Sequence, residues 1–551
     1  MALTQEAATQ PVVEVRGLTV QLPKGGDRVN AIEDINFSIA PRETLCVVGE
    51  SGSGKSVTAQ AIMGLLPKKQ LVVTAGEILL LGENLLTALP ERLRALRGSR
   101  MGMIFQEPMT ALNPVLTVGR QVEEVFATHS TLSPTDRARR VVDLLGSVKL
   151  ADPERLVHVY PHQLSGGQRQ RVMIAMALAM EPALLIADEP TTALDVTTQA
   201  RILELINEIK ISHNIGVLFI THDFGVVAEI ADRVAVMQKG RIVEAGNAAS
   251  VLGTPTHPYT RMLISSVPSM IPPDKRTNDA GAVVLRTRDL EMTYRGGGFF
   301  QRSREVHAVK KVSFSVQRGR TLGIVGESGS GKSTVARCIV RLINPTGGDI
   351  FIDDVEIAKL SPRRLHDYRR RIQIIFQDPY RSLNPRRRIG QSIVEGPLNY
   401  GISHDEAWRR AKDLLELVGL DPAVVDRYPH QFSGGQRQRV CIARALAMEP
   451  ELLVADEAVS SLDVSVQAQV LDLLDDIRLR FNLALLFITH DLRVAAQVCD
   501  DIAVMHQGEI VETGPTADVF GNPQEAYTQA LLAAAPGKEW RFGEGAITRR
   551  P

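Results

Sequence analysis

The sequence has no long apolar run and no recognisable secretion signal. Its best candidate for a membrane span, residues 172–187, is interrupted by Glu181 and Pro182, and a spanning helix needs about 18 or more consecutive apolar residues. The start of the chain, Met1 to Pro11, has neither a basic region nor an apolar core. We therefore expect a soluble, intracellular chain that contacts a membrane only through partner proteins.

The sequence also lacks an excess charge of either sign and has few cysteines. It contains 63 basic and 63 acidic residues, for a formal net charge of zero. This balance argues against a protein held mainly by nucleic-acid phosphates, so we expect no nucleic-acid partner. The cysteines, Cys46, Cys338, Cys441 and Cys499, have neither pairing nor metal-ligand spacing. They fit free thiols in a reduced compartment.

One ordered set of motifs occurs twice. The first set is Gly49-Glu50-Ser51-Gly52-Ser53-Gly54-Lys55-Ser56, Gln106, Leu164-Ser165-Gly166-Gly167-Gln168, Asp188-Glu189, Asp195 and His222. The second is Gly326-Glu327-Ser328-Gly329-Ser330-Gly331-Lys332-Ser333, Gln377, Phe432-Ser433-Gly434-Gly435-Gln436, Asp456-Glu457, Asp463 and His490. The later motifs recur at a constant separation of 268 residues and the P-loop lysines at 277. This is a tandem repeat of one whole domain, so two domains replace the three or four that length alone suggests.

Short apolar runs predict buried parallel strands in each copy. They cover 45–48, 184–187 and 217–220 in the first copy and 322–325, 452–455 and 485–488 in the second. Continuous hydrophobicity is expected for strands covered by helices on both faces. Charged helical patterns over 134–149 and 403–418 predict a helical insertion in each copy. The predicted fold class is α/β, with two tandem P-loop NTPase domains over 12–267 and 283–537 and a linker over 268–282.

Each glycine-rich motif follows an apolar strand and precedes a helix, as a P-loop requires. Glycines let backbone amides converge on phosphate oxygens, and the helix N-terminus favours negative charge. Lys55 and Lys332 are expected to reach the β- and γ-phosphates, and Ser56 and Ser333 to hold Mg²⁺. A glycine-rich turn of another kind is a realistic alternative for one isolated match, but not for two that share all their downstream partners.

Acidic pairs end another predicted strand in each copy. Asp188 and Asp456 are placed to support Mg²⁺, and the adjoining Glu189 and Glu457 to polarise or deprotonate an attacking water.

A histidine and a glutamine complete each predicted catalytic set. His222 and His490 follow strands in the string Thr-His-Asp, where an imidazole can reach the γ-phosphate and the water. A lone histidine there would more often be a capping or core residue, but the matched positions favour a function. Gln106 and Gln377 are expected to contact Mg²⁺ or water and to sense the γ-phosphate.

Ser165 and Ser433 each open a predicted helix that begins with two glycines. Exposed amides at that helix end suit a second anion-binding site. The alternative is a plain N-cap serine followed by turn glycines. That alternative does not explain why both copies read Ser-Gly-Gly-Gln-Arg-Gln-Arg-Val.

With these motifs the chain resembles ATP-binding cassette (ABC) ATPases, once in each half. In that family two cassettes pack head to tail and ATP lies between the P-loop of one and the signature of the other. The resemblance implies that ATP and Mg²⁺ are bound, and that Asp195 and Asp463 belong to loops coupling the two sites. The nucleotide-binding residues it implies are Gly49, Ser51, Gly52, Gly54, Lys55, Ser56, Gln106, Ser165, Gly167, Gln168, Tyr294, Gly326, Ser328, Gly329, Gly331, Lys332, Ser333, Thr334, Gln377, Ser433, Gly435 and Gln436. For Mg²⁺ they are Ser56, Gln106, Asp188, Ser333, Gln377 and Asp456, and for catalysis Glu189, His222, Glu457 and His490.

One departure from the family pattern concerns adenine. Tyr294 offers an aromatic platform in the second copy, whereas the matching place in the first copy falls near Leu22. Adenine binding in the first site would then rest on apolar packing.

The segments after the two histidines resemble the tails of dipeptide, oligopeptide and nickel importer ATPases. They read Pro255-Thr256-His257-Pro258-Tyr259-Thr260 and Asn522-Pro523-Gln524-Glu525-Ala526-Tyr527-Thr528, and each leads into an apolar helix, expected over 261–267 and 529–535. Some relatives carry an iron–sulfur cluster in this tail. Because no cysteine lies between Cys46 and Cys338 or after Cys499, we expect none.

The resemblance implies an ATPase that energises import of peptides or peptide-like solutes. Its expected partners are two transmembrane permease subunits, docked on the helical insertions, and a separate solute-binding protein. Its expected place is the cytoplasmic side of the inner (plasma) membrane, as a peripheral protein. The alternative is a soluble twin-cassette ATPase that acts on ribosomes or DNA. That class usually has a long charged linker or basic patches, which this sequence lacks.

Overall fold

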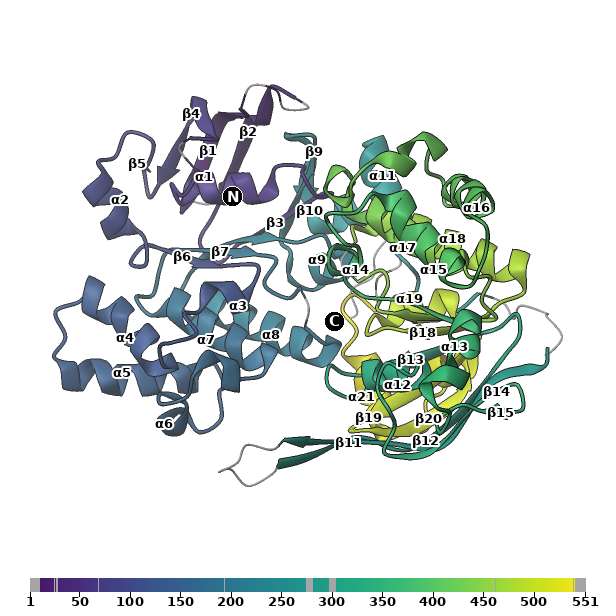
Figure 1. Cartoon of the computed structure of the whole chain (residues 1–551). Coiled ribbons are helices and arrows are strands. Elements are labelled where there is room, and N and C mark those ends of the chain that lie inside the picture. The colour runs from purple at the N-terminus through teal and green to yellow at the C-terminus, as the bar shows by residue number, and fades with distance from the viewer. Residues whose placement is uncertain are drawn as a thin grey trace, which may run out of the picture. The chain divides into compact units, whose positions relative to one another are not determined.

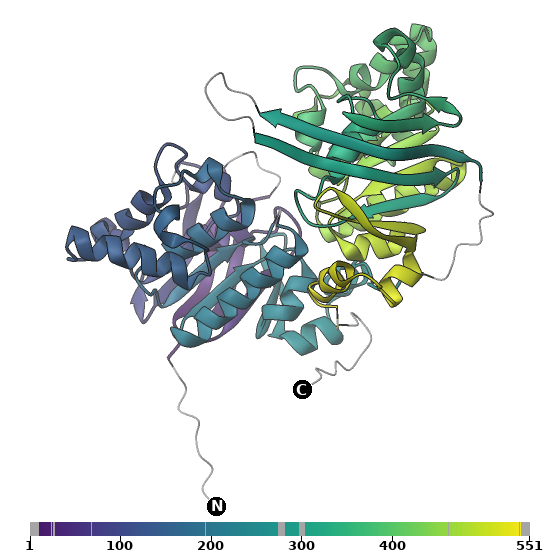
Figure 2. The same cartoon turned by 90° about the horizontal axis from the view of Figure 1, so that it is seen from below.

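The computed structural model divides the chain into two compact units (Figures 1 and 2). One unit comprises Met1–Val267 with Pro536–Pro551, and the other Pro268–Ala535. The structure describes residues 10–23, 25, 28–67, 69–192, 194–273, 281–296, 304–460, 462–538 and 540.

Each unit is built around a six-stranded, mainly parallel sheet. In the first unit the strand order is β10-β9-β3-β8-β7-β6, and in the second it is β16-β17-β18-β13-β19-β20. Only the β-hairpin strand at one edge, β10 or β20, runs antiparallel to its neighbour. The strands of the first sheet are β3 (Thr44–Val48), β6 (Met101–Ile104), β7 (Leu184–Asp188), β8 (Gly216–Ile220), β9 (Arg233–Gln238) and β10 (Arg241–Asn247). Those of the second are β13 (Thr321–Val325), β16 (Ile372–Ile375), β17 (Leu452–Asp456), β18 (Ala484–Ile488), β19 (Asp501–His506) and β20 (Glu509–Pro515).

Every residue of β3, β7 and β8 is buried, as is every residue of β13, β17 and β18. These are the six strands predicted from continuous apolar runs, and the prediction is confirmed. Strands buried on both faces need apolar side chains at every position rather than at alternate ones.

A second, antiparallel sheet in each unit was not predicted from the sequence. Its strand orders are β2-β1-β4-β5 and β12-β11-β14-β15. The strands are β1 (Val13–Gln21), β2 (Asn30–Ile39), β4 (Val72–Leu80), β5 (Glu83–Asn84), β11 (Val283–Gly296), β12 (Arg304–Gln317), β14 (Gly347–Ile352) and β15 (Val355–Glu356). Along β1 buried positions broadly alternate with more exposed ones, so this sheet turns one face to the core and the other outward.

The P-loop helix of each unit lies within the apolar core that joins the two sheets. In the first unit this core contains residues of β1 and β3 together with Ala59 and Ile62 of α1. The helices outside the insertions are α1 (Lys55–Ile62), α2 (Pro90–Leu96), α7 (Gly166–Leu178), α8 (Val196–Ser212), α9 (Phe224–Ile230), α10 (Ala248–Gly253) and α11 (Pro258–Ser265). Their counterparts are α12 (Lys332–Ile339), α13 (Pro362–Arg371), α17 (Gly434–Leu446), α18 (Val464–Phe481), α19 (Leu492–Val498), α20 (Thr516–Gly521) and α21 (Ala526–Ala533).

The predicted helical insertions are present in both units. They comprise α3 (Pro108–Ala111), α4 (Val118–His129), α5 (Pro134–Ser147), α6 (Pro153–Leu156) and η1 (Pro161–Gln163), and then α14 (Pro379–Ser382), α15 (Ile389–Asn399), α16 (His404–Leu417), η2 (Pro422–Asp426) and η3 (Pro429–Gln431). Helices α5 and α16 match the charged patterns that predicted them. Among the described residues, no helix is long and apolar enough to cross a membrane.

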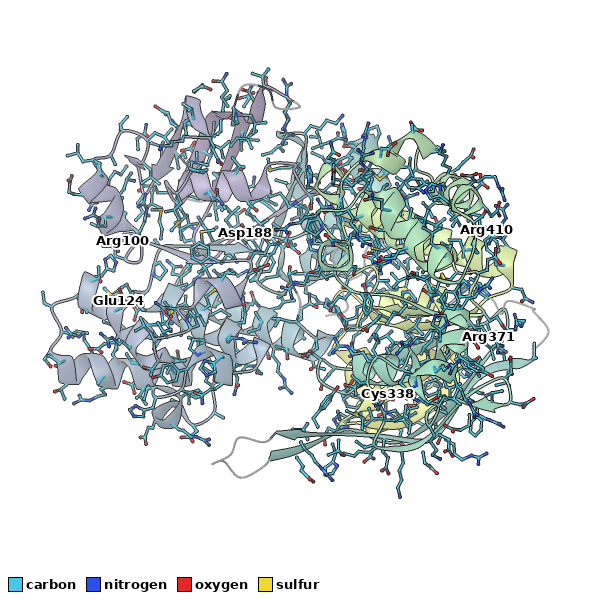
Figure 3. All side chains as sticks on the ribbon, in the orientation of Figure 1. Arg100, Glu124, Asp188, Cys338, Arg371 and Arg410 are labelled. Carbon is cyan, nitrogen blue, oxygen red and sulfur yellow. The ribbon has the colours of Figure 1, made fainter. Side chains whose placement is uncertain are left out.

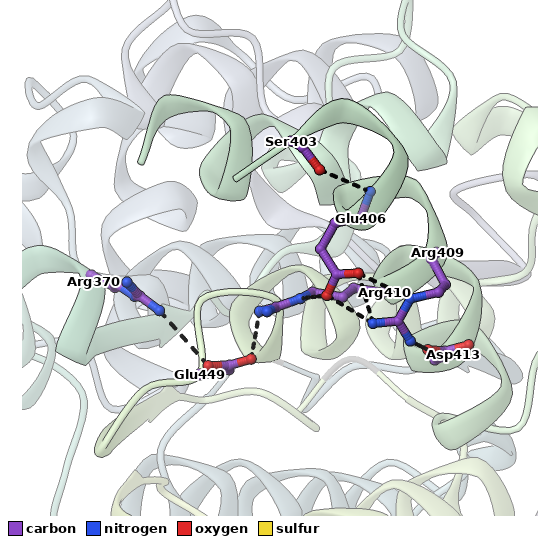
Figure 4. A network of polar contacts seen from close by, with 7 residues as sticks. All are labelled: Arg370, Ser403, Glu406, Arg409, Arg410, Asp413 and Glu449. Atoms are coloured by element: carbon purple, nitrogen blue, oxygen red, sulfur yellow. Dashed lines mark hydrogen bonds and ion pairs between the residues drawn. The ribbon is translucent and has the colours of Figure 1, made fainter. Parts of the chain in front are cut away.

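A network of ion pairs joins α16 to neighbouring elements of the second insertion (Figure 4). Arg410 contacts Glu406 one turn earlier at 2.6 Å and Glu449, beyond the end of α17, at 2.5 Å. Arg370 of α13 reaches the same Glu449 at 3.7 Å. Because these side chains are largely exposed, each pair contributes little stability on its own. The network orients the helices rather than holding the fold together.

The apolar tail helices begin three residues earlier than the sequence suggested. The observed bounds of α11 and α21 replace the predicted 261–267 and 529–535. In α11, His257 is the N-cap, its ring nitrogen accepts from the Tyr259 amide at 3.2 Å, and Pro258 occupies the first turn. Proline is well suited to that position because it has no amide hydrogen left unbonded, so the helix starts at the proline and not after it.

The first residues of the predicted linker pack on α19 in the second unit. Arg493 donates to the carbonyl of Pro268 at 3.3 Å, and Gln497 to those of Ser269 and Ile271 at 2.9 and 2.8 Å. Residues 274–280 of that linker lie outside the described part of the chain.

Candidate functional site

Both P-loops begin with a glycine that no other residue could replace without strain. Gly49 has φ 149° and Gly326 has φ 150°. A Cβ on Gly49 would lie 2.2 Å from the carbonyl oxygen of Met237, and one on Gly326 would lie 2.1 Å from that of Met505. The strand that ends at Met237 or Met505 therefore holds the loop directly against the sheet edge.

The P-loop lysines are buried and turned onto their own loops. Lys55 is 6% exposed, and its ammonium donates to the carbonyls of Gly49 at 2.7 Å and Glu50 at 3.0 Å. Lys332 is 4% exposed and makes the matching bonds at 2.8 and 2.7 Å. Each lysine opens the helix that follows its loop, where the helix end favours an anion. The structure brings the predicted Ser51, Gly52, Gly54, Ser56, Ser328, Gly329, Gly331, Ser333 and Thr334 into these same two loops and helix starts.

The predicted metal ligands meet at the end of β7 and β17. Ser56 donates to Asp188, which is labelled in Figure 3, at 3.1 Å, and Ser333 donates to Asp456 at 2.9 Å. Burial raises the pKa of Asp188, and the hydrogen bond from Ser56 offsets only part of that effect. A buried carboxylate beside a hydroxyl supplies the oxygen ligands that Mg²⁺ prefers, and bound cation charge would relieve the cost of burial.

No cluster of three or more histidine, cysteine, aspartate or glutamate side chains in the described residues is arranged as a metal site. This agrees with a Mg²⁺ ion held by one or two protein oxygens together with nucleotide phosphates.

The glutamate after each aspartate has a strained backbone. Glu189 has φ 48° and Glu457 has φ 49°, in the left-handed region that side chains other than glycine rarely adopt. The backbone amide of Glu189 donates to the carbonyl of Ile220 at the end of β8 at 2.9 Å, and Glu457 makes the same bond to Ile488. Strain that persists at the same position in both units is typical of a functional residue.

Each glutamate carboxylate binds the predicted histidine and glutamine. In the first unit, His222 Nδ1 lies 3.1 Å from Glu189 Oε1, and Gln106 donates to Oε2 at 2.8 Å. Thr192, which the sequence did not single out, donates to the same oxygen at 3.1 Å. The expected role for Gln106 was contact with Mg²⁺ or water, and in the structure its side chain binds the glutamate.

The second unit repeats this arrangement. His490 Nδ1 lies 3.3 Å from a Glu457 carboxylate oxygen, and Gln377 donates to Glu457 at 2.7 Å. Burial raises the pKa of Glu457, but the hydrogen bond and charge of His490 outweigh it and leave the pKa below its ordinary value. Burial lowers the pKa of His490, and its bond to Glu457 more than restores it. The pair is therefore set to keep the glutamate ionised.

The signature serines cap their own helices. Ser165 Oγ accepts from the Gln168 amide at 3.2 Å, and the Gln168 side chain accepts from the Ser165 amide at 2.9 Å. Ser433 and Gln436 form the same capping box. The plain N-cap reading is thus correct as local structure.

The second signature glycine has a separate structural reason. A Cβ on Gly167 would lie 2.6 Å from Thr198 of α8, and one on Gly435 would lie 2.2 Å from Val466 of α18. A glycine is needed there because a neighbouring helix approaches closely. Asp195 caps α8, accepting from the Thr198 amide at 2.9 Å, while Asp463 occupies the same N-cap position on α18.

The two proposed adenine positions lie at equivalent places in the antiparallel sheets. Tyr294 is in β11 and 39% exposed, whereas Leu22 follows the last residue of β1. Val20 and Met292, two residues earlier, pair with β2 and β12 residues that stand 277 apart, like the P-loop lysines. The sheet register therefore matches Leu22 to Tyr294.

Sequence reasoning missed a tyrosine from each tail helix that reaches a P-loop. Tyr259 Oη lies 3.3 Å from the backbone nitrogen of Glu50, and Tyr527 Oη lies 3.2 Å from that of Glu327. The two tyrosines are 268 residues apart, so the repeat offset could have marked them. Nothing in the sequence links them to loops about 200 residues away.

Comparison with known proteins agrees with this geometry. The family model "ABC transporter" matches residues 32–192 and 309–460, so the chain belongs to the ABC transporter family and is an ATP-binding, ATP-hydrolysing protein with two cassettes. The model "Oligopeptide/dipeptide transporter, C-terminal region" matches 243–308 and 511–545.

Two curated relatives align over nearly the whole chain. The "Peptidoglycan transport ATP-binding protein YejF" of Agrobacterium fabrum is 48% identical over 536 residues, which are 96% of this chain and 97% of the relative. The "Glutathione import ATP-binding protein GsiA" of Escherichia coli is 47% identical over 560 residues, covering 96% and 90%. The solved dimeric cassette MJ0796 bound to ADP and Pi is 30% identical, with a TM-score of 0.39, covering 43% of this chain and 98% of that one. These relatives are transport proteins, and the alternative of an ATPase acting on ribosomes or DNA finds no support.

Proposed function

We propose that this chain is the ATP-hydrolysing subunit that energises import of peptides or peptide-like solutes. Its partners would be two transmembrane permease subunits and a separate solute-binding protein. The observation that carries the proposal is the near full-length likeness to peptidoglycan-transport and glutathione-import ATP-binding proteins. The transporter-specific C-terminal region after each cassette supports it.

The contacts in each unit suggest a division of labour among its residues. Lys55 would leave the Gly49 and Glu50 carbonyls to hold the β- and γ-phosphates. Ser56 and Asp188, already hydrogen-bonded to each other, would hold Mg²⁺, which supplies positive charge to the phosphates when bound. Lys332, Ser333 and Asp456 would act alike in the second unit.

The strained glutamates would act on water. Glu189 is ionised and held by its neighbours on both oxygens, so it can accept a proton from an attacking water once one oxygen is freed. Gln106 binds that carboxylate directly, and replacing this bond by one to nucleotide or water would report occupancy. His222 keeps the carboxylate charged and would contact the γ-phosphate. Glu457, Gln377 and His490 would have the same roles in the second unit.

We further propose that each ATP is completed by the signature helix of the other cassette, as in the family. The amides at the start of α7 and α17 suit an anion, and the serines that cap them, Ser165 and Ser433, are exposed. The chain would work as a peripheral protein on the cytoplasmic side of the plasma membrane, attached through the permeases.

Uptake in a null strain tests the proposal. Strains with and without the gene, both freed of redundant importers, are compared for accumulation of labelled glutathione, di- and oligopeptides, peptide antibiotics and nickel. We expect uptake of at least one peptide-like solute to be lost and then restored by the wild-type gene. Unchanged uptake of all of them would refute the importer assignment.

A further inference from the structure

The helix after each cassette carries a tyrosine that grips the P-loop. In the first unit Tyr259, the second residue of α11, is 6% exposed. Its hydroxyl accepts from the Glu50 amide at 3.3 Å and donates to the Glu50 carboxylate at 3.1 Å. In the second unit the Tyr527 hydroxyl accepts from the Glu327 amide at 3.2 Å. A buried hydroxyl that uses its hydrogen-bonding capacity fixes its partner's position.

The same loop residue is held from its other side by the P-loop lysine. Lys55 donates to the carbonyl of Glu50 at 3.0 Å, and Lys332 donates to that of Glu327 at 2.7 Å. The N–H of this residue is therefore fixed by the tail and its C=O by the group expected to hold phosphate. When the lysine turns to a phosphate it releases that carbonyl, and the tyrosine contact remains to keep the first bend of the loop in place.

The tail helix is itself anchored to the sheet edge. In the first unit Glu244 of β10 accepts from the amides of Thr256 at 2.8 Å and His257 at 3.1 Å. Burial raises the pKa of Glu244, but these amides outweigh it and keep the pKa below its ordinary value. Since His257 caps α11, this carboxylate sets where the helix begins and where Tyr259 points.

The second unit reaches the same result with different residues. Glu512 of β20 accepts from the amides of Gln524 at 2.8 Å and Glu525 at 3.2 Å. The histidine and proline that start α11 are replaced by Glu525 and Ala526 at the start of α21, and the ring of Tyr527 stacks on His506 with centroids 3.9 Å apart. The cap chemistry differs between the copies, while the anchoring glutamate and the tyrosine–loop contact are kept.

We propose that Tyr259 and Tyr527 are positioning residues for nucleotide binding: each hydroxyl fixes the first bend of its P-loop, so that the tail of each cassette sets the affinity of that cassette for nucleotide phosphates. The proposal rests on ATP binding by the family and not on the identity of the imported solute. ADP binding therefore tests it separately from transport.

The test measures ADP binding to the full-length double variant Tyr259→Phe/Tyr527→Phe by isothermal titration calorimetry. Loss of one hydrogen bond per site should raise the Kd for ADP about 2- to 10-fold. In steady-state assays the KM for ATP should rise by a similar factor, with kcat nearly unchanged. The matched control is Tyr400→Phe, which removes a tyrosine hydroxyl that donates to the backbone carbonyl of His366 at 2.5 Å, in the second insertion.

The control separates positioning from general stability, because each variant loses hydroxyl bonds to local structure. We expect Tyr400→Phe to bind ADP as the wild type does. Unchanged ADP affinity in the double variant, equal weakening in the control, or a fall in kcat with KM unchanged would each overturn the proposal. The variant Glu244→Gln/Glu512→Gln, which weakens the anchors and leaves the tyrosines intact, should raise the ADP Kd in the same direction, and unchanged affinity there would show that the tail does not act through the tyrosines.

Discussion

Replacing Glu189 or Glu457 with glutamine should stop hydrolysis and leave nucleotide binding intact. Each carboxylate directly follows the aspartate expected to support Mg²⁺ and has a left-handed backbone. Glutamine keeps the shape and can still bind through its one amide oxygen. It cannot accept a proton from water, so the variant isolates the loss of a general base from the loss of structure.

The expected loss of the chemical step is about 10²- to 10⁴-fold, the usual contribution of general-base catalysis. This corresponds to about 3–5 kcal/mol of barrier. Phosphate release under saturating MgATP and ATP binding at equilibrium should be measured for both single variants and the double variant. The affinity for ATP should stay within a few fold of wild type, because neither glutamate lies in a P-loop.

A matched control uses two other glutamates with the same backbone. Glu181 and Glu449 each have φ 51°, lie 268 residues apart, and are exposed side chains in surface ion pairs. Glu181→Gln/Glu449→Gln removes the same charge at the same conformation, and it should hydrolyse ATP normally. Wild-type hydrolysis per site in either Glu189→Gln or Glu457→Gln would refute its role as base. Loss of activity in the control would show that the effect is one of folding.

His490→Gln should shift the acid limb of the kcat–pH profile to higher pH, because the histidine bond that lowers the pKa of Glu457 is lost while the burial that raises it remains; an unmoved limb would show that the pair is not coupled. Lys55→Ala or Lys332→Ala should abolish solute uptake, while co-purification with the permeases stays normal, since the lysine holds phosphate; retained uptake would contradict that role. Cutting the chain within 274–280, near Asn278 and outside the described residues, should give fragments that hydrolyse ATP poorly alone and regain activity when mixed. Full activity of a monomeric fragment would rule out shared sites.

The parts of the fold that could be predicted are those in which burial leaves an unambiguous pattern. Strands such as 184–188 are apolar at every position because helices cover both faces. The antiparallel sheet escaped prediction because β1 is only half buried, and its alternation is broken by register shifts after Val15 and Leu18. An interrupted period-two pattern is a weak signal over nine residues.

The candidate site divides in the same way. Residues carried by short motifs, such as Lys55 and Glu189, could be found because their spacing to neighbouring elements is fixed by local chain geometry. The Tyr259–Glu50 contact could not be found, because it joins two segments 209 residues apart. Only the folded sheet brings β10 and its tail beside the P-loop. Thr192 was missed for another reason: a single threonine near a glutamate is not a recognisable pattern.

The two copies also separate what the chemistry requires from what the surroundings allow. The bonds of lysine to loop, serine to aspartate and histidine to glutamate differ between the units by at most a few tenths of an ångström. The position beside adenine changes from leucine to tyrosine, and the residues that start the tail helix change as well. Because both sets sit on the same sheet geometry, the fold does not force this difference in tolerance. The constraint lies at the phosphates and the water, where positions must be held within a fraction of an ångström, and the tail tyrosine falls on the constrained side of that division.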